Sequence, residues 1–351
     1  ARFEGRQGSS DEGSSKVASS SQAMMLPVWM WIALAVPTLL WVTTYFVPLL
    51  WIAVRGSQDL KKKYDAEWAL VTGGSTGIGR AICDELARQG LNIIVAALPD
   101  DHLDKAVKEL SELYRSQEFV KCGVSFAPGQ DYLGKLRAAS EGKTVQLIFN
   151  NAGFIVTGFF DTQPLPKHLV NVECNATAAV GVTHHFASSL LAAKKRGCVV
   201  FTSSASAYIP NPFAIIYGAT KAFMSQFAAS LAVELQCQGV DVLVVHPSPV
   251  ASNFYNAVEH KIDAMESFKK IAVTPNVLPK TIFAAVGRVV LLDQGATAIL
   301  MRLFVALLPY NFLASLIAFL APVLPDYVAN NKDRGLCGGA NKAAAAGKKQ
   351  S

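Results

Sequence analysis

Tyr217 and Lys221 are the two residues whose spacing most directly suggests chemistry. They lie four residues apart in a stretch, 217–234, that we predict to be helical, so both side chains project from one helix face. A phenol has an ordinary pKa of about 10, and a nearby ammonium group favours the phenolate and lowers that pKa. Such a tyrosine can donate a proton to a carbonyl oxygen or remove one from an alcohol. The same spacing also occurs where a tyrosine begins a helix and a solvated lysine follows, so the pair alone does not establish catalysis.

Ser204 is a second candidate for a chemical role. It follows a predicted strand, 198–202, and ligands of open α/β sheets meet the carboxyl ends of strands. A hydroxyl group there could hold a substrate carbonyl in position. The sequence around Ser204 lacks the nucleophile-elbow arrangement of histidine and acid partners, which argues against a hydrolase.

A glycine-rich turn, Gly73 to Gly79, lies between an apolar run, 68–72, and a helix-like stretch, 80–89. Gly73 permits a tight turn, Gly77 lets the backbone approach a pyrophosphate, and Gly79 allows the helix to pack closely on the sheet. The free N–H groups at the start of the helix attract phosphate. The GxxxGxG spacing differs from the commoner GxGxxG, but its position between strand and helix predicts a nucleotide site.

The elements that must position these residues alternate between strands and helices. We predict strands at 68–72, 92–98, 120–126, 145–150, 198–202 and 240–246, with helical stretches between them. This pattern predicts an α/β fold, a Rossmann-type doubly wound parallel sheet, over residues 64–300.

The chain's ends differ in composition from this central domain. Residues 1–23 are polar and we expect them to be disordered, whereas 24–54 is apolar and long enough to be a membrane anchor. Pro37 leaves two forms open, a transmembrane helix or a hairpin. A second uncharged segment, 303–325, could span a membrane, lie in its interface or cover a substrate tunnel. Residues 331–351 form a basic tail that we also expect to be disordered.

Composition excludes several other functions. The net charge of +6 is mild, so nucleic acid is not an expected partner. The six cysteines lie far apart without a metal-ligand or redox spacing, so we expect reduced thiols and no metal site.

Taken together, the motifs resemble those of the short-chain dehydrogenase/reductase family over residues 64–260. The resemblance rests on the glycine-rich turn, Asn150-Asn151-Ala152-Gly153, Ser204, Tyr217-(x)3-Lys221 and Pro247-(x)2-Val250. It implies NAD(P)-dependent hydride transfer between an alcohol and a ketone. It assigns the acid/base role to Tyr217, ribose binding to Lys221, carbonyl orientation to Ser204 and support of a relay water to Asn175. The cofactor-binding residues that it implies are Gly73, Ser75, Thr76, Gly77, Ile78, Gly79, Arg80, Asn151, Ala152, Gly153, Tyr217, Lys221, Pro247 and Val250.

Cofactor preference is expected to be NADP(H) rather than NAD(H). NAD-using relatives usually carry an aspartate near Ala97, and the arginine of many NADP-using relatives is replaced by Leu98. Without a carboxylate to repel a 2′-phosphate, we expect Arg80 to reach toward that group.

A narrower resemblance, in 60–64, 202–212 and 217–223, is to the membrane-bound 17β-hydroxysteroid dehydrogenase and very-long-chain 3-oxoacyl-CoA reductase group. It implies a lipid-like ketone or alcohol as substrate, with 3-ketodihydrosphingosine reductase and a non-catalytic membrane-bound scaffold as alternatives. Homodimerisation through helices near 170–195 and 217–235 is common in the family.

The expected location is the endoplasmic reticulum membrane, with the catalytic domain in the cytosol. Arg55 and Lys61 to Lys63 follow the anchor, and such basic residues favour the cytosolic side. Lys348-Lys349-Gln350-Ser351 resembles a dilysine retrieval signal, and a basic low-complexity tail is the alternative. Retrieval requires 303–325 not to cross the membrane, unless the anchor is a hairpin.

Overall fold

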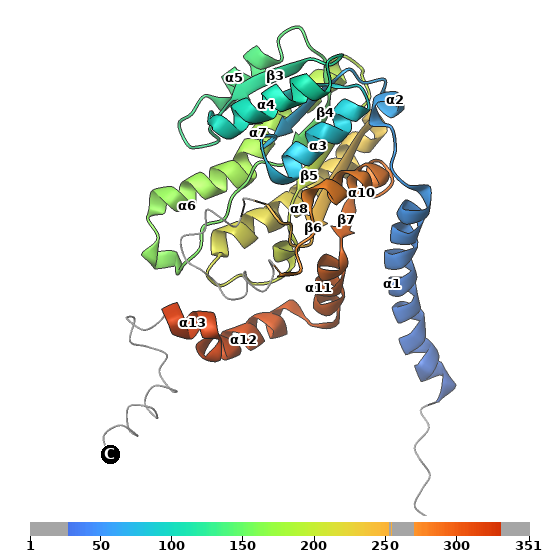
Figure 1. Cartoon of the computed structure of the whole chain (residues 1–351). Coiled ribbons are helices and arrows are strands. Elements are labelled where there is room, and N and C mark those ends of the chain that lie inside the picture. Colours follow the sequence, from blue (N-terminus) through green and yellow to red (C-terminus); the bar gives the residue numbers. More distant parts are fainter. Residues whose placement is uncertain (1–26, 253, 255–269, 331–351) are drawn as a thin grey trace, which may run out of the picture. The chain divides into compact units, whose positions relative to one another are not determined.

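A computed structural model of the chain describes residues 27–252, 254 and 270–330 (Figure 1). The predictions for 1–23 and 331–351 concern residues outside these ranges. The chain divides into two units, 1–48 and 49–351.

The central sheet has seven parallel strands in the order β3-β2-β1-β4-β5-β6-β7. Their bounds are β1 Trp68–Thr72, β2 Asn92–Ala97, β3 Phe119–Gly123, β4 Val145–Asn150, β5 Gly197–Thr202, β6 Val240–Pro247 and β7 Leu291–Gln294. The predicted doubly wound fold is confirmed. The short strand β7 was not predicted, because four residues that include Asp293 and Gln294 carry little strand pattern.

Helices cover both faces of the sheet (Figure 1). Residues of α3, α4 and α10 contribute to one buried hydrophobic cluster, and residues of α5, α7 and α8 to the other. Their bounds are α3 Gly77–Arg88, α4 Asp101–Leu113, α5 Tyr132–Ala139, α7 Ala178–Ala192, α8 Ile215–Leu235 and α10 Leu278–Ala285; α2 is Leu60–Tyr64 and α6 is Leu165–Val172.

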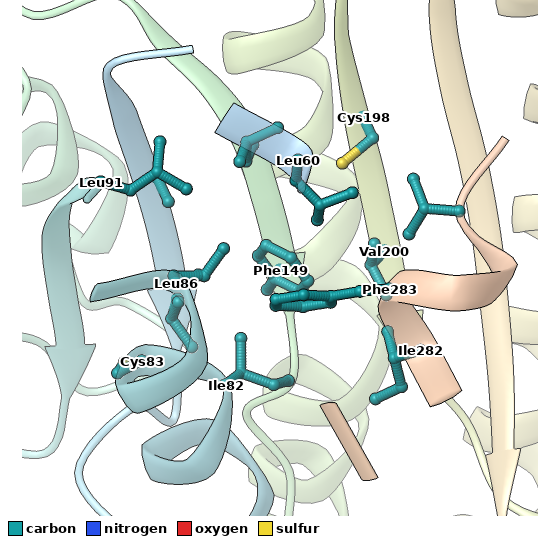
Figure 2. Packing of buried hydrophobic residues seen from close by; sticks show 14 of the residues in the cluster. Leu60, Ile82, Cys83, Leu86, Leu91, Phe149, Cys198, Val200, Ile282 and Phe283 are labelled. Atoms are coloured by element: carbon teal, nitrogen blue, oxygen red, sulfur yellow. The ribbon is translucent and has the colours of Figure 1, made fainter. Parts of the chain in front are cut away.

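The first of these clusters joins the middle of the sheet to α3 and α10 (Figure 2). The rings of Phe149 on β4 and Phe283 on α10 lie 5.9 Å apart, centroid to centroid. Ile82 and Leu86 of α3 are fully buried in the same cluster. Burying large apolar side chains contributes about 1.5–3 kcal/mol each, so this packing fixes α3, whose first turn carries the glycines, against β1.

Helix α1, Val28–Arg55, is continuous through Pro37 and Pro48. The hairpin alternative is therefore wrong. The hydroxyls of Thr43 and Thr44 bond within the helix, from Thr43 to the Leu39 carbonyl at 2.8 Å and from Thr44 to the Leu40 carbonyl at 2.7 Å. Among the described residues it is the one unbroken helix with the length and hydropathy to cross a membrane.

The second apolar segment is divided between two helices. Helix α11, Ala296–Leu307, and helix α12, Tyr310–Leu320, meet at a bend of 107°. The break lies at Leu308-Pro309, because proline cannot continue the hydrogen-bond pattern of a preceding helix. A final helix, α13, runs from Pro325 to Asn330.

Candidate active site

The glycine-rich turn leaves β1 at the carboxyl edge of the sheet. Gly73 (φ 65°) and Gly77 (φ 55°) adopt left-handed backbone conformations, which side chains disfavour. A Cβ atom on Gly79 would come to 2.1 Å from the carbonyl oxygen of Gly73. The three glycines are therefore required by the backbone itself.

The start of α3 fits a phosphate group. Its N-cap residue, Thr76, makes no side-chain hydrogen bond to the first turn, so the N–H groups there have no capping side chain. A helix N-terminus of this kind is a binding site for anions. Ser75 and Ile78, also predicted to bind cofactor, lie in this turn and at its junction with the helix. The residues present thus fit the pyrophosphate of a dinucleotide.

Asn151 connects three strand ends beside this turn. Its amide nitrogen donates to the Gly73 carbonyl oxygen at 3.4 Å, and its side-chain oxygen accepts from the Thr202 hydroxyl at 3.1 Å. The backbone N–H groups of Asn151 and Ala152 donate to the Thr72 hydroxyl at 3.0 and 3.1 Å. The predicted Asn-Asn-Ala-Gly motif therefore holds the ends of β1, β4 and β5 together.

Arg80 is occupied by carboxylates. Its guanidinium lies 2.9 Å from Asp84 and 3.4 Å from Glu109, and its side chain is only 16% exposed. The expectation that Arg80 reaches toward a 2′-phosphate gains no support from these contacts.

Lys221 is buried one helical turn after Tyr217 on α8. Its ammonium donates to the carbonyl oxygen of Thr202 at 2.8 Å and lies 5.6 Å from the centre of the Tyr217 ring. Burial lowers the pKa of Lys221 to about 8, with the Cys174 thiol opposing the shift. The solvated-lysine alternative is excluded by this burial.

Ser204 lies at the end of β5, beside the same helix. Its hydroxyl accepts from the Ser206 N–H at 3.1 Å and so caps the 3-10 turn Ala205–Tyr208. The preceding residue, Ser203, donates to the carbonyl oxygen of Lys221 at 2.8 Å. Ser204 thus follows the strand whose last residue, Thr202, accepts from Lys221, and Lys221 in turn lies beside the Tyr217 ring. The catalytic roles of these three residues stay predictions.

Asn175 lies in a wide π-helical turn, Glu173–Thr177, between α6 and α7. Its side-chain oxygen accepts from the Phe154 N–H at 2.9 Å, and its amide nitrogen donates to the Phe154 carbonyl oxygen at 2.8 Å. A weaker bond runs to the Thr220 hydroxyl at 3.3 Å. These bonds tie α7 to the loop after Gly153 and to α8. The relay-water role of Asn175 stays a prediction.

Two further cofactor candidates lie after β6. Pro247 ends that strand opposite Gln294 of β7. Val250 is buried and forms a bridge with Val273, and its role in cofactor binding stays a prediction.

A polar chain that sequence reasoning missed lies behind Lys221. The Ser225 hydroxyl lies 2.9 Å from that of Ser203 and 2.8 Å from Nε2 of His246. Nδ1 of the fully buried His246 is 3.4 Å from Asp293, and the Tyr208 hydroxyl donates to Asp293 at 2.6 Å. This polar chain of side chains joins α8 to the turn that Ser204 caps. No local sequence motif indicates the polar chain, because the strand β7, which carries Asp293, was not predicted.

Among the described residues, no group of three or more His, Cys, Asp or Glu side chains is arranged to hold a metal ion. The five cysteines in these ranges are free thiols.

Comparison with known proteins agrees with this geometry. The family described as "short chain dehydrogenase" matches residues 67–263. The very-long-chain 3-oxoacyl-CoA reductase of Bos taurus is 33% identical over 192 residues, which cover 53% of this chain and 60% of that protein. The "inactive hydroxysteroid dehydrogenase-like protein 1" of Homo sapiens is 30% identical over 196 residues, covering 56% of this chain and 59% of that protein. The chain thus spans about 60% of the length of these relatives.

Solved structures show the same fold. A 7β-hydroxysteroid dehydrogenase superposes with a TM-score of 0.65 at 24% identity and covers 74% of this chain and 100% of its own. A short-chain dehydrogenase from Sphingobium yanoikuyae in complex with NADPH has a TM-score of 0.59 at 21% identity, covering 68% and 93%. The chain belongs to the short-chain dehydrogenase/reductase family of NAD(P)-dependent oxidoreductases.

Proposed function

We propose that this protein is an NADP(H)-dependent oxidoreductase that interconverts a ketone and a secondary alcohol on a lipid-like substrate. The observation that carries the proposal is the buried ammonium of Lys221, which faces the Tyr217 ring and bonds to Thr202, two residues before Ser204. A buried lysine is costly, and its position beside a phenol at the carboxyl edge of the sheet gives it a chemical use.

Each candidate catalytic residue of the chain has its own role in the proposed reaction. The nicotinamide, when bound, supplies or accepts the hydride. Tyr217 donates a proton to the carbonyl oxygen in reduction and takes it back in oxidation. The positive charge of Lys221 favours the phenolate form of that tyrosine. The Ser204 hydroxyl holds the substrate oxygen in place. Asn175 fixes the Phe154 backbone beside them.

The NADP(H) preference rests on the end of β2. Ala97 closes that strand and exposed Leu98 follows, so no carboxylate stands where it would repel a 2′-phosphate. Asp100, the first carboxylate after the strand, accepts from the Leu103 N–H at 3.0 Å and caps α4. Because Arg80 already pairs with two carboxylates, the preference depends on the absence of repulsion.

The substrate class follows from the relatives and from α1. A 3-oxoacyl-CoA or a hydroxysteroid is the proposed substrate, because relatives bear the names very-long-chain 3-oxoacyl-CoA reductase and 17-beta-hydroxysteroid dehydrogenase type 3. A 3-ketosphingoid base is the alternative from sequence. A helix of 28 residues with mean hydropathy 1.7 in its apolar window suits an enzyme whose substrate partitions into membranes.

A non-catalytic scaffold is the second candidate, since several relatives bear the name "inactive". Fold alone does not decide activity, but the buried lysine beside Tyr217 favours the enzyme.

Location and assembly are part of the same proposal. We propose the endoplasmic reticulum membrane with the catalytic domain in the cytosol, on the basis of exposed Arg55 and Lys62 after the anchor and Lys348-Lys349 near the end of the sequence. A homodimer through α7 and α8 is the proposed assembly, supported by exposed Leu191, Phe223 and Val233 on these helices.

The deciding experiment follows NADPH consumption by the full chain in phospholipid vesicles. The substrates are a 3-oxoacyl-CoA, 3-ketosphinganine and a ketosteroid, with the Tyr217→Phe variant as matched control. Turnover of one lipid ketone by the wild type alone supports the proposal. Bound NADPH without turnover of any substrate supports the scaffold.

A further inference from the structure

The C-terminal apolar segment 296–330, here called the arm, has both its ends fixed to the catalytic domain. At its start, buried Ala298 donates its N–H to the Ser248 hydroxyl at 3.1 Å. Near its end, the Tyr327 ring packs edge-on against Phe159 at 5.4 Å and lies 6.1 Å from Phe213. Because both ends meet the same domain, the residues between them cannot cross a bilayer once. The arm therefore leaves the domain and returns to it.

The arm lies across the carboxyl edge of the sheet, where the candidate active site is. Figure 1 shows α11 running from β7 and α12 and α13 turning back beneath that edge. Phe159 and Phe213, the partners of Tyr327, lie on the loop after β4 and on the segment between Ser204 and Tyr217, and the Gly158 N–H bonds to the Phe213 carbonyl oxygen at 2.9 Å. The arm's end is thus attached to the two chain segments that border the catalytic residues.

The outer surface of the arm is apolar. Leu300, Phe304 and Leu307 share one face of α11 and are 64%, 47% and 78% exposed. On α12, Phe312 and Phe319 share a face and are 53% and 80% exposed, whereas Leu313 is buried. No charged residue occurs between Leu303 and Pro325. Exposed aromatic and aliphatic side chains without charge suit a bilayer interface better than water.

We propose that the arm lies in the surface of a phospholipid bilayer and passes an apolar substrate from it to the active site. The bilayer is the favoured occupant because α1 independently has the length and hydropathy to cross a membrane, and because 303–325 has no charged residue to form the ion pairs common at the rim of a protein interface. The substrate step rests on the proposed function, whereas the membrane contact does not.

The membrane contact is tested with the full chain in vesicles of phosphatidylcholine. In a Cys237→Ser, Cys337→Ser background, an environment-sensitive fluorophore is attached at Phe319→Cys, and a matched control carries it at Lys195→Cys, an exposed site after α7. We expect blue-shifted emission at 319 that nitroxide-bearing lipids quench, and neither effect at 195. Equal spectra at the two sites, or a blue shift at 319 that the nitroxide lipids do not quench, would overturn the proposal, the latter pointing to a protein contact.

The topology is tested separately with a membrane-impermeant maleimide in sealed vesicles. Ala296→Cys and Val328→Cys bracket the arm and are exposed sites. We expect both to react from the same side of the membrane as Lys195→Cys. Reaction from opposite sides would mean that 303–325 crosses the bilayer and would end the proposal.

The substrate step is tested by Phe319→Glu, with Ser111→Glu, an exposed site on α4 outside the arm, as the control for added charge. For a long-chain ketone dissolved in vesicles, we expect KM to rise about tenfold in Phe319→Glu, because a charged side chain weakens interfacial burial, and to stay at the wild-type value in Ser111→Glu. KM for a short, water-soluble ketone and the Kd for NADPH should stay at wild-type values. An equal KM for the long-chain ketone in wild type and Phe319→Glu contradicts this step. Absence of all turnover defeats the proposed function and leaves the fluorescence result standing.

Discussion

The ammonium nitrogen of Lys221 and the carbonyl oxygen of Thr202 form a 2.8 Å hydrogen bond that joins α8 to the end of β5. The bond holds the buried charge at a fixed place between Tyr217 and the residues that lead into Ser204. It gives the lysine a polar partner within the protein, so its position is set before any cofactor binds.

Replacing the phenol removes the proton donor without disturbing the fold. We expect Tyr217→Phe to lower kcat by about 10²–10⁴-fold, the usual contribution of general acid–base catalysis. The Kd for NADPH, measured by fluorescence, should change less than about twofold, because the ring remains and only its hydroxyl is lost. Full turnover by this variant would show that another group moves the proton.

Cofactor affinity should depend on the charge of Lys221. Its pKa is lowered to about 8 by burial, so the ammonium is present below that pH and is lost as pH rises through it. We expect the Kd for NADPH in Tyr217→Phe, which removes the phenol's own titration, to rise several-fold between about pH 7 and 9. Lys221→Met in the same background should bind NADPH more weakly with a flat profile. An unchanged pH profile after Lys221→Met would assign the titration to another group.

The lowered pKa of Lys221 also affects the folding stability of the protein. Here a rising pH is favourable, whereas it weakens NADPH binding. Between about pH 8 and the ordinary lysine pKa near 10.4, the unfolded chain binds the proton and the folded chain does not. We therefore expect Lys221 to increase the unfolding free energy of the apoprotein as pH rises across that range. Denaturant titrations give the difference in unfolding free energy between wild type and Lys221→Met, and we expect this difference to change by about 1–3 kcal/mol over the same pH range. A difference that does not change with pH would mean that the buried amine titrates normally.

Gly79 packs so closely against the glycine-rich turn that we expect no side chain to fit at this position. In Gly79→Ala the new Cβ would meet the Gly73 carbonyl oxygen and the Asn151 amide, both backbone-linked or anchored groups. We expect a loss of about 3 kcal/mol in unfolding free energy and loss of NADPH binding. Gly181→Ala on α7 is the control, since its Cβ would meet only the end of the Leu133 side chain at 3.2 Å. Similar thermal unfolding of the two variants would contradict this account.

We expect the polar chain behind Lys221 to affect catalysis by holding the turn that Ser204 caps in position. Tyr208→Phe removes the 2.6 Å bond to Asp293, which leaves a buried carboxylate with one fewer partner and costs about 1–3 kcal/mol. Because Tyr208 ends the turn that Ser204 caps, we expect kcat to fall while the Kd for NADPH stays constant. A lowered melting temperature with unchanged kcat would show that the polar chain has a structural role only.

Local sequence predicted the features that depend on local patterns. The glycine-rich turn, the strand β1 and the Tyr217–Lys221 helix face follow from apolar runs and fixed spacing, and the structure has them at the predicted residues. The apolar segment 303–325 is divided at Pro309 between α11 and α12, and its relation to a membrane stays a prediction. The role expected of Arg80 depended on its long-range partner Glu109, which spacing does not reveal. The contacts of His246 and Tyr327 likewise join residues far apart in the sequence.

The wide turn at Glu173–Thr177 has a consequence for how this protein tolerates insertion and deletion. A π turn holds one residue more than a regular helical turn, so removing a single residue there would let α6 and α7 merge into one uniform helix. Because five residues of a π turn cover nearly the same rotation as four residues of an α-helix, α6 and α7 would keep almost the same orientation. What would change is the turn itself, from which Asn175 reaches the Phe154 peptide group beside Asn171, whose amide donates to the same carbonyl oxygen at 2.7 Å. The extra residue is therefore absorbed locally, and its loss should disturb the two asparagines more than the helices on either side.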